Sequence, residues 1–192
     1  MKKQIITIAG SPGSGKSSTA KAIAASLGFQ HFSSGDIFRK IAMERGESIE
    51  AMNITAEAQR DIDLKVDELL QEIYRDGDRL VIDSRMAWHW MPSSFKVFLM
   101  LDPDTAARRI FGDVQSTGRV SEDAASVAEV RQSIDRRFAS EQRRYAALYS
   151  VNPTDPLNFD IVVNTKHNDL PTVTAIVAAA YRAWSAALKQ RQ

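Results

Sequence analysis

The chain has 192 residues and a formal net charge of +1 at pH 7, and its 44% hydrophobic content suffices for the core of one α/β domain. A near-neutral charge gives no long-range attraction to nucleic acid or to an anionic membrane, so neither partner is expected. Cysteine is absent, which excludes disulfides, thiolate metal sites and a thiol nucleophile. The sequence has neither the apolar core of a signal peptide nor an apolar run long enough to span a bilayer, so we expect a cytoplasmic protein.

A glycine-rich loop near the N-terminus carries the most specific signal in the chain. Residues 10–17 read GSPGSGKS and satisfy the phosphate-binding pattern G-x-x-x-x-G-K-[S/T]. A β-branched run at 4–9 predicts a buried strand before the loop, and residues 18–27 predict a helix after it, ended by Gly28. Strand, loop and helix in this order are the context in which such a loop binds the phosphates of a nucleotide.

Each residue type in this loop suits a triphosphate. Glycines let the backbone curl so that several N–H groups face one phosphate, and the helix N-terminus adds its dipole. We expect Lys16 to contact the β- and γ-phosphates of ATP, and the Ser17 hydroxyl to ligate Mg²⁺. The predicted cofactor-binding residues of the loop are Gly10, Ser11, Pro12, Gly13, Ser14, Gly15, Lys16, Ser17 and Ser18.

Strands and helices alternate along the rest of the chain. Further strands are expected at 29–32, 79–83, 96–101 and 160–163. Further helices are expected at 37–45, 55–74, 103–112, 121 to about 150, with Ser121 as the cap, and 171 to about 190. This order predicts an α/β fold of the phosphate-loop NTPase class, with a five-stranded parallel sheet covered by helices on both faces. In such a sheet, ligands bind beyond the carboxyl ends of the strands.

We expect a single kinase-like domain with two small additions to its core. The core comprises about 1–34, 79–111 and 124–192, and a helical insertion covers about 35–78. Residues 48–53 are predicted to be a polar connector within the insertion. A short lid is expected at about 112–123, because this segment has two glycines and few apolar residues. We expect a monomer.

An acidic residue and a set of arginines complete the predicted chemistry. Asp83 ends an apolar strand, where a carboxylate in a phosphate-loop protein can hold Mg²⁺, so the predicted metal residues are Ser17 and Asp83. Arginine suits phosphate because its planar fork donates two bonds at once. About half of a set of nine arginines is expected to face the cleft: Arg39, Arg85, Arg108, Arg109, Arg119, Arg136, Arg137, Arg143 and Arg144.

Three other candidate motifs give weaker evidence about function. We interpret Trp88, His89 and Trp90 as packing residues at the end of the sheet rather than a base-stacking platform. The three histidines show no metal-ligand spacing, so no metal site built from protein side chains alone is expected. A guanine-nucleotide switch is excluded, because residues 164–168 have Asn where its base-recognition motif needs Asp, and 83–86 lack the glycine of D-x-x-G.

Taken together, these stretches resemble nucleoside monophosphate kinases, and specifically the short cytidylate kinases found in archaea and some bacteria. The phosphate loop is the sharpest match. Residues 32–39 resemble the family's S-x-G-[D/E]-I-[F/Y]-R segment, and residues 81–85 resemble a strand that ends in [D/E]-G-R, with Ser84 in place of the glycine. Two weaker matches are residues 44–46 with 61–67, which resemble the family's acceptor-binding helices, and residues 160–165, which resemble its last strand. A third is the family's R-x-x-S-E-x-x-R-Y helix, matched by Arg137, Ser140, Glu141, Arg144 and Tyr145.

The resemblance implies roles for particular residues. It implies transfer of the γ-phosphoryl group of ATP, with Mg²⁺, to a nucleoside monophosphate, with CMP or dCMP preferred. The implied acceptor-binding residues are Ser34, Asp36, Arg39, Asp63, Arg85 and Arg144. The implied catalytic residues are Lys16, Arg85, Arg119 and Arg137, with Arg108 and Arg109 on the ATP side. The predicted lid carries Arg119 as its one arginine, fewer than is usual in the family.

Two alternatives stay open at this point. The first is the same chemistry on another small acceptor, such as AMP, UMP, shikimate or another metabolite, because the side chains that recognise the base cannot be placed from the sequence. The second is a regulatory or assembly protein that binds nucleotide and hydrolyses ATP slowly. The arginines on the acceptor side argue against the second alternative.

Overall fold

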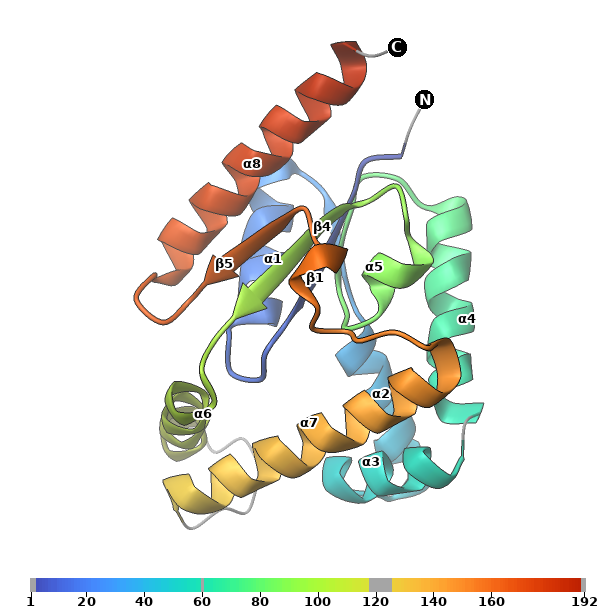
Figure 1. Cartoon of the computed structure of the whole chain (residues 1–192), viewed down its shortest axis with the longest axis vertical. Helices are drawn as coiled ribbons and strands as arrows, with labels where there is room; N and C mark the ends of the chain where they lie inside the picture. Colours follow the sequence, from blue (N-terminus) through green and yellow to red (C-terminus); the bar gives the residue numbers. More distant parts are fainter. Residues whose placement is uncertain (1–2, 60, 118–125, 191–192) are drawn as a thin grey trace.

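A computed structural model describes residues 3–59, 61–117 and 126–190. Within these ranges the chain forms one parallel sheet of five strands in the order β2-β3-β1-β4-β5 (Figure 1). The strands are β1 (Ile5–Gly10), β2 (Gln30–Ser33), β3 (Leu80–Asp83), β4 (Phe95–Met100) and β5 (Ile161–Asn164). The predicted α/β class and five-stranded parallel sheet are therefore confirmed.

Helices cover both faces of the sheet because its central strands are apolar on both sides. On one face, Ile6 and Ile8 of β1 pack with Ile23 of α1 (Lys16–Leu27) and Val177 of α8 (Leu170–Gln190). On the other face, Ile5 packs beside α4 (Asp61–Asp76) and the short α5 (Ala87–Trp90). This alternation along β1 places every second side chain in one of two separate cores.

The remaining helices lie at the carboxyl ends of the strands, which is the edge where a parallel sheet binds its ligands (Figure 1). Helices α2 (Ser34–Arg45) and α3 (Ile49–Ala58) pack with α4 around a small cluster of their own that includes Met52. Helices α6 (Pro103–Thr117) and α7 (Val127–Tyr149) pack together through Val130 and Ile134. A turn of 3-10 helix, η1 (Pro156–Asn158), precedes β5.

One prediction for the insertion was wrong. Residues 48–53 were expected to form a polar connector, but α3 begins at Ile49, with the Ser48 side chain accepting a hydrogen bond from the Ala51 N–H at 3.1 Å. The helix forms because Met52 and Ala56, one turn apart, are buried against α2 and α4. The single helix expected at 55–74 is accordingly two helices, with α4 beginning only at Asp61.

The predicted lid also needs correction. Helix α6 was expected to end at Gly112, but it continues to Thr117, so 112–117 are helical rather than a loop. A glycine inside an exposed helix costs only about 1 kcal/mol relative to alanine, which does not suffice to end it. Helix α7 is one unbroken helix that Ser126 caps, whereas Ser121 was expected to cap it. Ser121 and the rest of the predicted lid from 118 onward lie outside the described residues.

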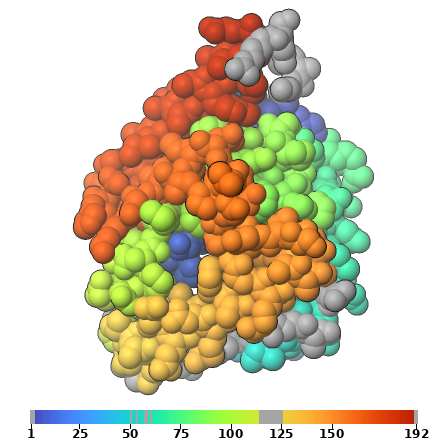
Figure 2. Space-filling view, in the orientation of Figure 1, coloured from blue at the N-terminus to red at the C-terminus, as the bar shows by residue number. Residues whose placement is uncertain are grey.

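The space-filling view shows how far the first strand and its loop are covered. On the face drawn, the blue N-terminal segment is visible at the bottom of a small hollow between the green and orange segments (Figure 2). A hollow of about 20 Å³ is lined there by Gly10, Pro12, Phe138 and Pro153 among others. In the part of the chain that the structure describes, no helix is long and apolar enough to cross a membrane.

Candidate active site

A cavity of about 220 Å³ lies at the carboxyl ends of β1, β2 and β3. Its walls come from the phosphate loop, from the starts of α2 and α5, and from the facing sides of α4 and α7. The charged side chains that line it are Lys16, Arg39, Asp63, Asp67, Asp83, Arg85, Arg137, Glu141 and Arg144. Four arginines of the predicted set of nine therefore face this cavity.

The phosphate loop has the backbone that its glycines predict. Gly13 and Gly15 have φ angles of 66° and 81°, in the left-handed region that side chains disfavour. A Cβ at Gly10 would lie 2.3 Å from the Leu99 carbonyl oxygen, so a side chain does not fit there. Among the described residues, the buried Ser14 hydroxyl has no hydrogen-bond partner. A buried orphan hydroxyl in a curled loop at a helix N-terminus fits a phosphate oxygen.

Lys16 enters the cavity from the first turn of α1. Its Nζ donates a hydrogen bond to the Ser11 carbonyl oxygen of the same loop at 3.1 Å. Burial, followed by the positive charge of Arg85, lowers the pKa of Lys16 to about 7. A bound polyphosphate would reverse both effects, because it would favour the protonated form.

Ser17 and Asp83 meet at the mouth of the loop although Ser17 lies at the start of α1 and Asp83 at the end of β3. The Ser17 hydroxyl donates to the Asp83 carboxylate, and the Ser33 hydroxyl is 3.4 Å from the same oxygen. A hydroxyl and a carboxylate beside a phosphate loop match the oxygen ligands that Mg²⁺ prefers. Among the described residues, no three His, Cys, Asp or Glu side chains form a metal-binding group.

Two arginines share one buried carboxylate in the middle of the cavity. Glu141 of α7, which is 4% exposed, lies 2.6 Å from Arg85 Nε and 3.1 Å from Arg137 Nε, through different oxygens. Each guanidinium group therefore keeps its Nη donors for another anion. Glu141 matched the family's helix in the sequence, but no role was predicted for it. The i, i+4 spacing between Arg137 and Glu141 is the one sequence signal that could have predicted their ion pair.

Substitution of Glu141 by Gln should lower kcat about ten- to a hundredfold, because an amide has one acceptor oxygen for two guanidinium groups. The loss should be larger at pH 8 than at pH 6, because the Glu141 charge raises the pKa of Lys16. Steady-state kinetics across this pH range measure both effects. Asp135→Asn, on an exposed part of the same helix, is the matched control. A pH profile identical to that of the wild type would contradict this role.

Two further acids, one turn apart on α4, line the cavity. Asp63 lies 3.1 Å from Arg144 of α7, and both side chains are buried. Asp67 accepts hydrogen bonds from Trp90 Nε1 at 2.8 Å and from the Tyr149 hydroxyl. Burial raises the pKa of both carboxyl groups, to about 6 for Asp67. Asp63 and Arg144 were predicted to bind the acceptor, and the structure adds that they pair with each other.

A pH dependence of stability follows from Asp67. Its pKa is raised from 3.8, so its contribution to folding is greatest below about pH 4 and is lost as the pH rises through 6. The free energy of unfolding of Asp67→Asn, measured relative to wild type by urea denaturation, should therefore rise between pH 5 and pH 7.5. Asp61→Asn, exposed on the same helix, is the control. Parallel stability curves for wild type and Asp67→Asn would contradict the burial of a charged Asp67.

The start of α2 supplies the other predicted acceptor residues. Ser34 and Arg39 line the cavity, and the Ser34 hydroxyl is 3.4 Å from the Asp83 carbonyl oxygen. Asp36 forms an ion pair with Arg39 on the open side, where both side chains are more than half exposed. Ser84, which replaces the family's glycine, is buried in the cavity wall and accepts a hydrogen bond from the Met86 N–H at 3.3 Å.

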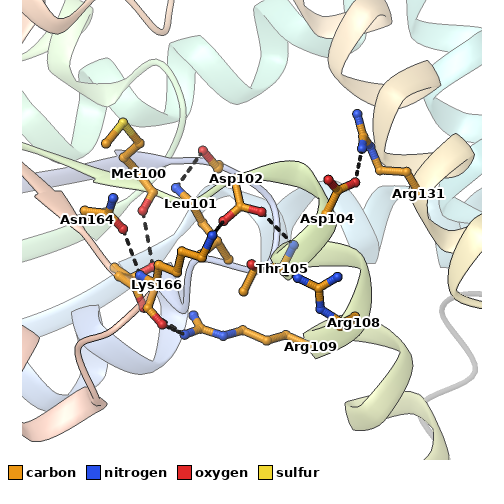
Figure 3. Close-up of polar contacts among 12 residues, drawn as sticks. Met100, Leu101, Asp102, Asp104, Thr105, Arg108, Arg109, Arg131, Asn164 and Lys166 are labelled. Atoms are coloured by element: carbon orange, nitrogen blue, oxygen red, sulfur yellow. Dashed lines mark hydrogen bonds and ion pairs between the residues drawn. The ribbon is translucent and has the colours of Figure 1, made fainter.

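Arg108 and Arg109, which were predicted to contact ATP, lie on α6 outside the cavity lining. Arg109 donates to the Thr165 and Lys166 carbonyl oxygens at 2.7 and 3.2 Å, which ties α6 to the segment after β5 (Figure 3). Arg108 donates to the Thr105 hydroxyl at 3.3 Å. Neither residue lines the cavity, so contact of these two arginines with ATP stays a prediction. Arg119 lies outside the described residues.

The aromatic residues after β3 pack as expected. Trp88 is buried and donates from Nε1 to the Arg85 carbonyl oxygen at 2.8 Å. The rings of His89 and Trp90 contact Tyr149 at the end of α7. The packing interpretation missed one feature, since Trp90 also holds Asp67 in the cavity wall. That contact joins α4 to α5 across 23 residues of sequence, which no local pattern indicates.

Comparison with known proteins shows the family of this chain. The family model described as the cytidylate kinase-like family matches residues 5–167. The chain belongs to this family. A cytidylate kinase of Halobacterium salinarum is 34% identical over 185 residues, covering 95% of this chain and 91% of the relative. The sequence resemblance is thereby confirmed, and this cytidylate kinase-like chain is a phosphotransferase.

Solved structures of two other kinases have the same fold. A gluconokinase of Sinorhizobium meliloti superposes with a TM-score of 0.63 at 15% identity, covering 99% of this chain and 98% of that one. A shikimate kinase of Bacteroides thetaiotaomicron gives a TM-score of 0.60 at 15% identity, covering 98% and 99%. At this identity the likeness establishes the fold of the cytidylate kinase-like chain and says nothing of its acceptor.

Proposed function

We propose that this protein transfers the γ-phosphoryl group of ATP to a nucleoside monophosphate, with CMP or dCMP as the acceptor. One observation carries the proposal: a single cavity is lined by Lys16 and Ser17 of the phosphate loop and, on its other walls, by Arg39, Arg85 and Arg137. Cations on two sides of one cavity suit a reaction between two anions. The cytidylate kinase from Halobacterium salinarum supports the choice of acceptor.

The proposed chemistry needs no general base. An oxygen of the acceptor phosphate, already an anion, attacks the γ-phosphorus, and the bond to the β-bridging oxygen breaks to release ADP. Catalysis then consists of positioning the two phosphates and neutralising their charge. Lys16 and the loop amides would hold the donor phosphates, while Arg39 and the free Nη groups of Arg85 would hold the acceptor phosphate.

Ser17 and Asp83 would hold Mg²⁺ with the nucleotide. When bound, the ion would neutralise charge on the donor phosphates. Their direct contact shows that a hydroxyl and a carboxylate can converge there. Arg137 would complete the cationic wall beside the migrating phosphoryl group, held by the same Glu141 carboxylate that holds Arg85.

A panel of acceptors tests the proposal. The purified chain with ATP and Mg²⁺ is offered CMP, dCMP, UMP, AMP, shikimate and gluconate in turn, and nucleotide products are separated by chromatography. The proposal expects CDP or dCDP to form in step with ADP. Preference for a non-nucleotide would reject the acceptor and keep the phosphotransferase. ADP and inorganic phosphate formed equally with every acceptor would favour the slow ATP-hydrolysing alternative.

A further inference from the structure

Cations of the cavity gather at the phosphate loop, and two acids, Asp63 and Asp67, line the cavity from α4. Lys16, Arg85 and Arg137 gather at the phosphate loop, and Arg85 contacts Glu141 on α7. Eight residues further along α7, Tyr149 contacts Asp67, and at 1.5 Å per residue this separates the two contacts by about 12 Å along the helix. That separation is comparable to the length of a nucleoside monophosphate. An acceptor with its phosphate on the arginines would therefore point its base toward Asp67.

The two acids differ in what holds them. Asp63 is paired with a cation, Arg144, at 3.1 Å. Asp67 is held by two neutral donors, with Trp90 on one carboxylate oxygen and Tyr149 on the other. An ionised carboxylate has about four lone-pair sites, so each oxygen of Asp67 can accept one more hydrogen bond. Asp67 is thus a fixed acceptor, and among the described residues no ion pair reaches its carboxylate.

Apolar side chains line the cavity together with its charged groups. They include Phe38, Ile49, Val66, Leu70 and Met86. Apolar side chains beside a few fixed polar groups are the usual composition of a site for a flat heterocycle. Where such side chains limit the access of water, a ligand group that faces Asp67 without a hydrogen to donate would leave two acceptors opposed and unsatisfied.

We propose that Asp67 selects the acceptor base by accepting a hydrogen bond from its exocyclic amino group. The inference rests on the proposed function and adds a specificity-determining residue to it. Cytosine carries an amino donor at position 4, whereas uracil carries an oxo acceptor at the same position. Asp67 therefore favours CMP over UMP, and Trp90 and Tyr149 act as positioning residues that fix its carboxylate.

The first arm of the test uses the wild-type enzyme and three acceptors that differ at one position. CMP carries the 4-amino group, UMP carries a 4-oxo group, and the monophosphate of pyrimidin-2-one ribonucleoside carries only hydrogen there. We expect kcat/KM for UMP to be at least about a hundredfold below that for CMP, since a site built to pair a donor strongly rejects an analogue without it. The pyrimidin-2-one monophosphate should fall between the two.

The second arm uses Asp67→Asn, whose amide can turn an N–H toward a 4-oxo group. The ratio of kcat/KM for CMP to that for UMP should fall at least tenfold in this variant. Tyr149→Phe is the matched comparison, because it removes one of the two anchors and keeps the carboxylate group, which Trp90 still holds. Its activity should fall with both acceptors, and its ratio of kcat/KM for CMP to that for UMP should fall by much less than the ratio of Asp67→Asn.

The outcomes separate the inference from the proposed function. If the wild-type enzyme phosphorylates no nucleoside monophosphate, both the proposed function and the role of Asp67 are wrong. A wild-type enzyme that uses the three pyrimidines equally, or an Asp67→Asn variant that loses activity with an unchanged ratio, overturns the role of Asp67 and keeps the kinase. If Asp67→Asn does not fold, the analogue series with wild type decides the question alone.

Discussion

Replacing Lys16 by alanine is expected to lower kcat at least a hundredfold, the scale for losing one charged contact to a transition state. The half-buried Lys16 side chain lies in the cavity beside Arg85, and the hydrogen bond from its ammonium group to the Ser11 carbonyl keeps it at the mouth of the loop. No other cation of the loop can replace it, since its neighbours there are glycines, serines and proline. Steady-state kinetics with ATP and CMP measure the effect.

Lys21→Ala is the matched control, because this lysine is exposed on the same helix. It should change kcat by less than about twofold, as expected for a surface substitution away from the site. Binding of ATP to Lys16→Ala, measured by calorimetry, shows whether the variant still forms its loop. Turnover equal to wild type in Lys16→Ala would remove the phosphate loop from the mechanism.

Replacing Arg85 by alanine is expected to lower kcat/KM for the acceptor about a hundred- to a thousandfold while leaving the Kd for ATP within about threefold. Arg85 is positioned by Glu141 at 2.6 Å through Nε, and its Nη donors remain available in the cavity for the acceptor phosphate. Kinetics at varied acceptor concentration, together with calorimetric titration of ATP, separate the two substrates.

Arg85→Lys supplies the control for charge without the guanidinium fork. We expect it to recover part of the loss in Arg85→Ala, but not all, because an ammonium group cannot hold a phosphate with two parallel hydrogen bonds. It also keeps a cation near the buried Glu141, so its stability should exceed that of Arg85→Ala. An ATP affinity that falls as steeply as acceptor efficiency would place Arg85 on the donor side instead.

The strands of the sheet and the phosphate loop could be predicted because each is determined by a short stretch of sequence. Apolar runs mark the central strands β1, β3 and β4 to within a residue or two, since a strand buried on both faces is apolar along most of its length. Gly28 and Gly46 end their helices with φ angles of 65° and 69°, as glycines at helix ends commonly do. The phosphate loop needs its glycines because its backbone adopts positive φ angles and approaches Leu99 closely. The eight-residue motif alone is enough to predict this conformation.

The rest of the site depends on contacts between distant segments. Tyr149 and Asp67 are 82 residues apart in sequence, and nothing near either residue indicates the partner. Helix α3 was missed because Met52 and Ala56 are buried against neighbouring helices, and the sequence of this short segment does not show that burial. Glu141 was matched but given no role, because a lone acid on a charged helix usually faces solvent.

A bisubstrate analogue tests the central claim most directly: one cavity holds two nucleotides whose phosphates meet between the loop and the arginines. The analogue joins the 5′ oxygens of adenosine and cytidine through five phosphates, and its binding is measured by calorimetry. We expect one molecule to bind per chain, at least about a hundredfold more tightly than ATP, and to be displaced by both ATP and CMP. Binding no tighter than ATP, with displacement by ATP alone, would contradict the account.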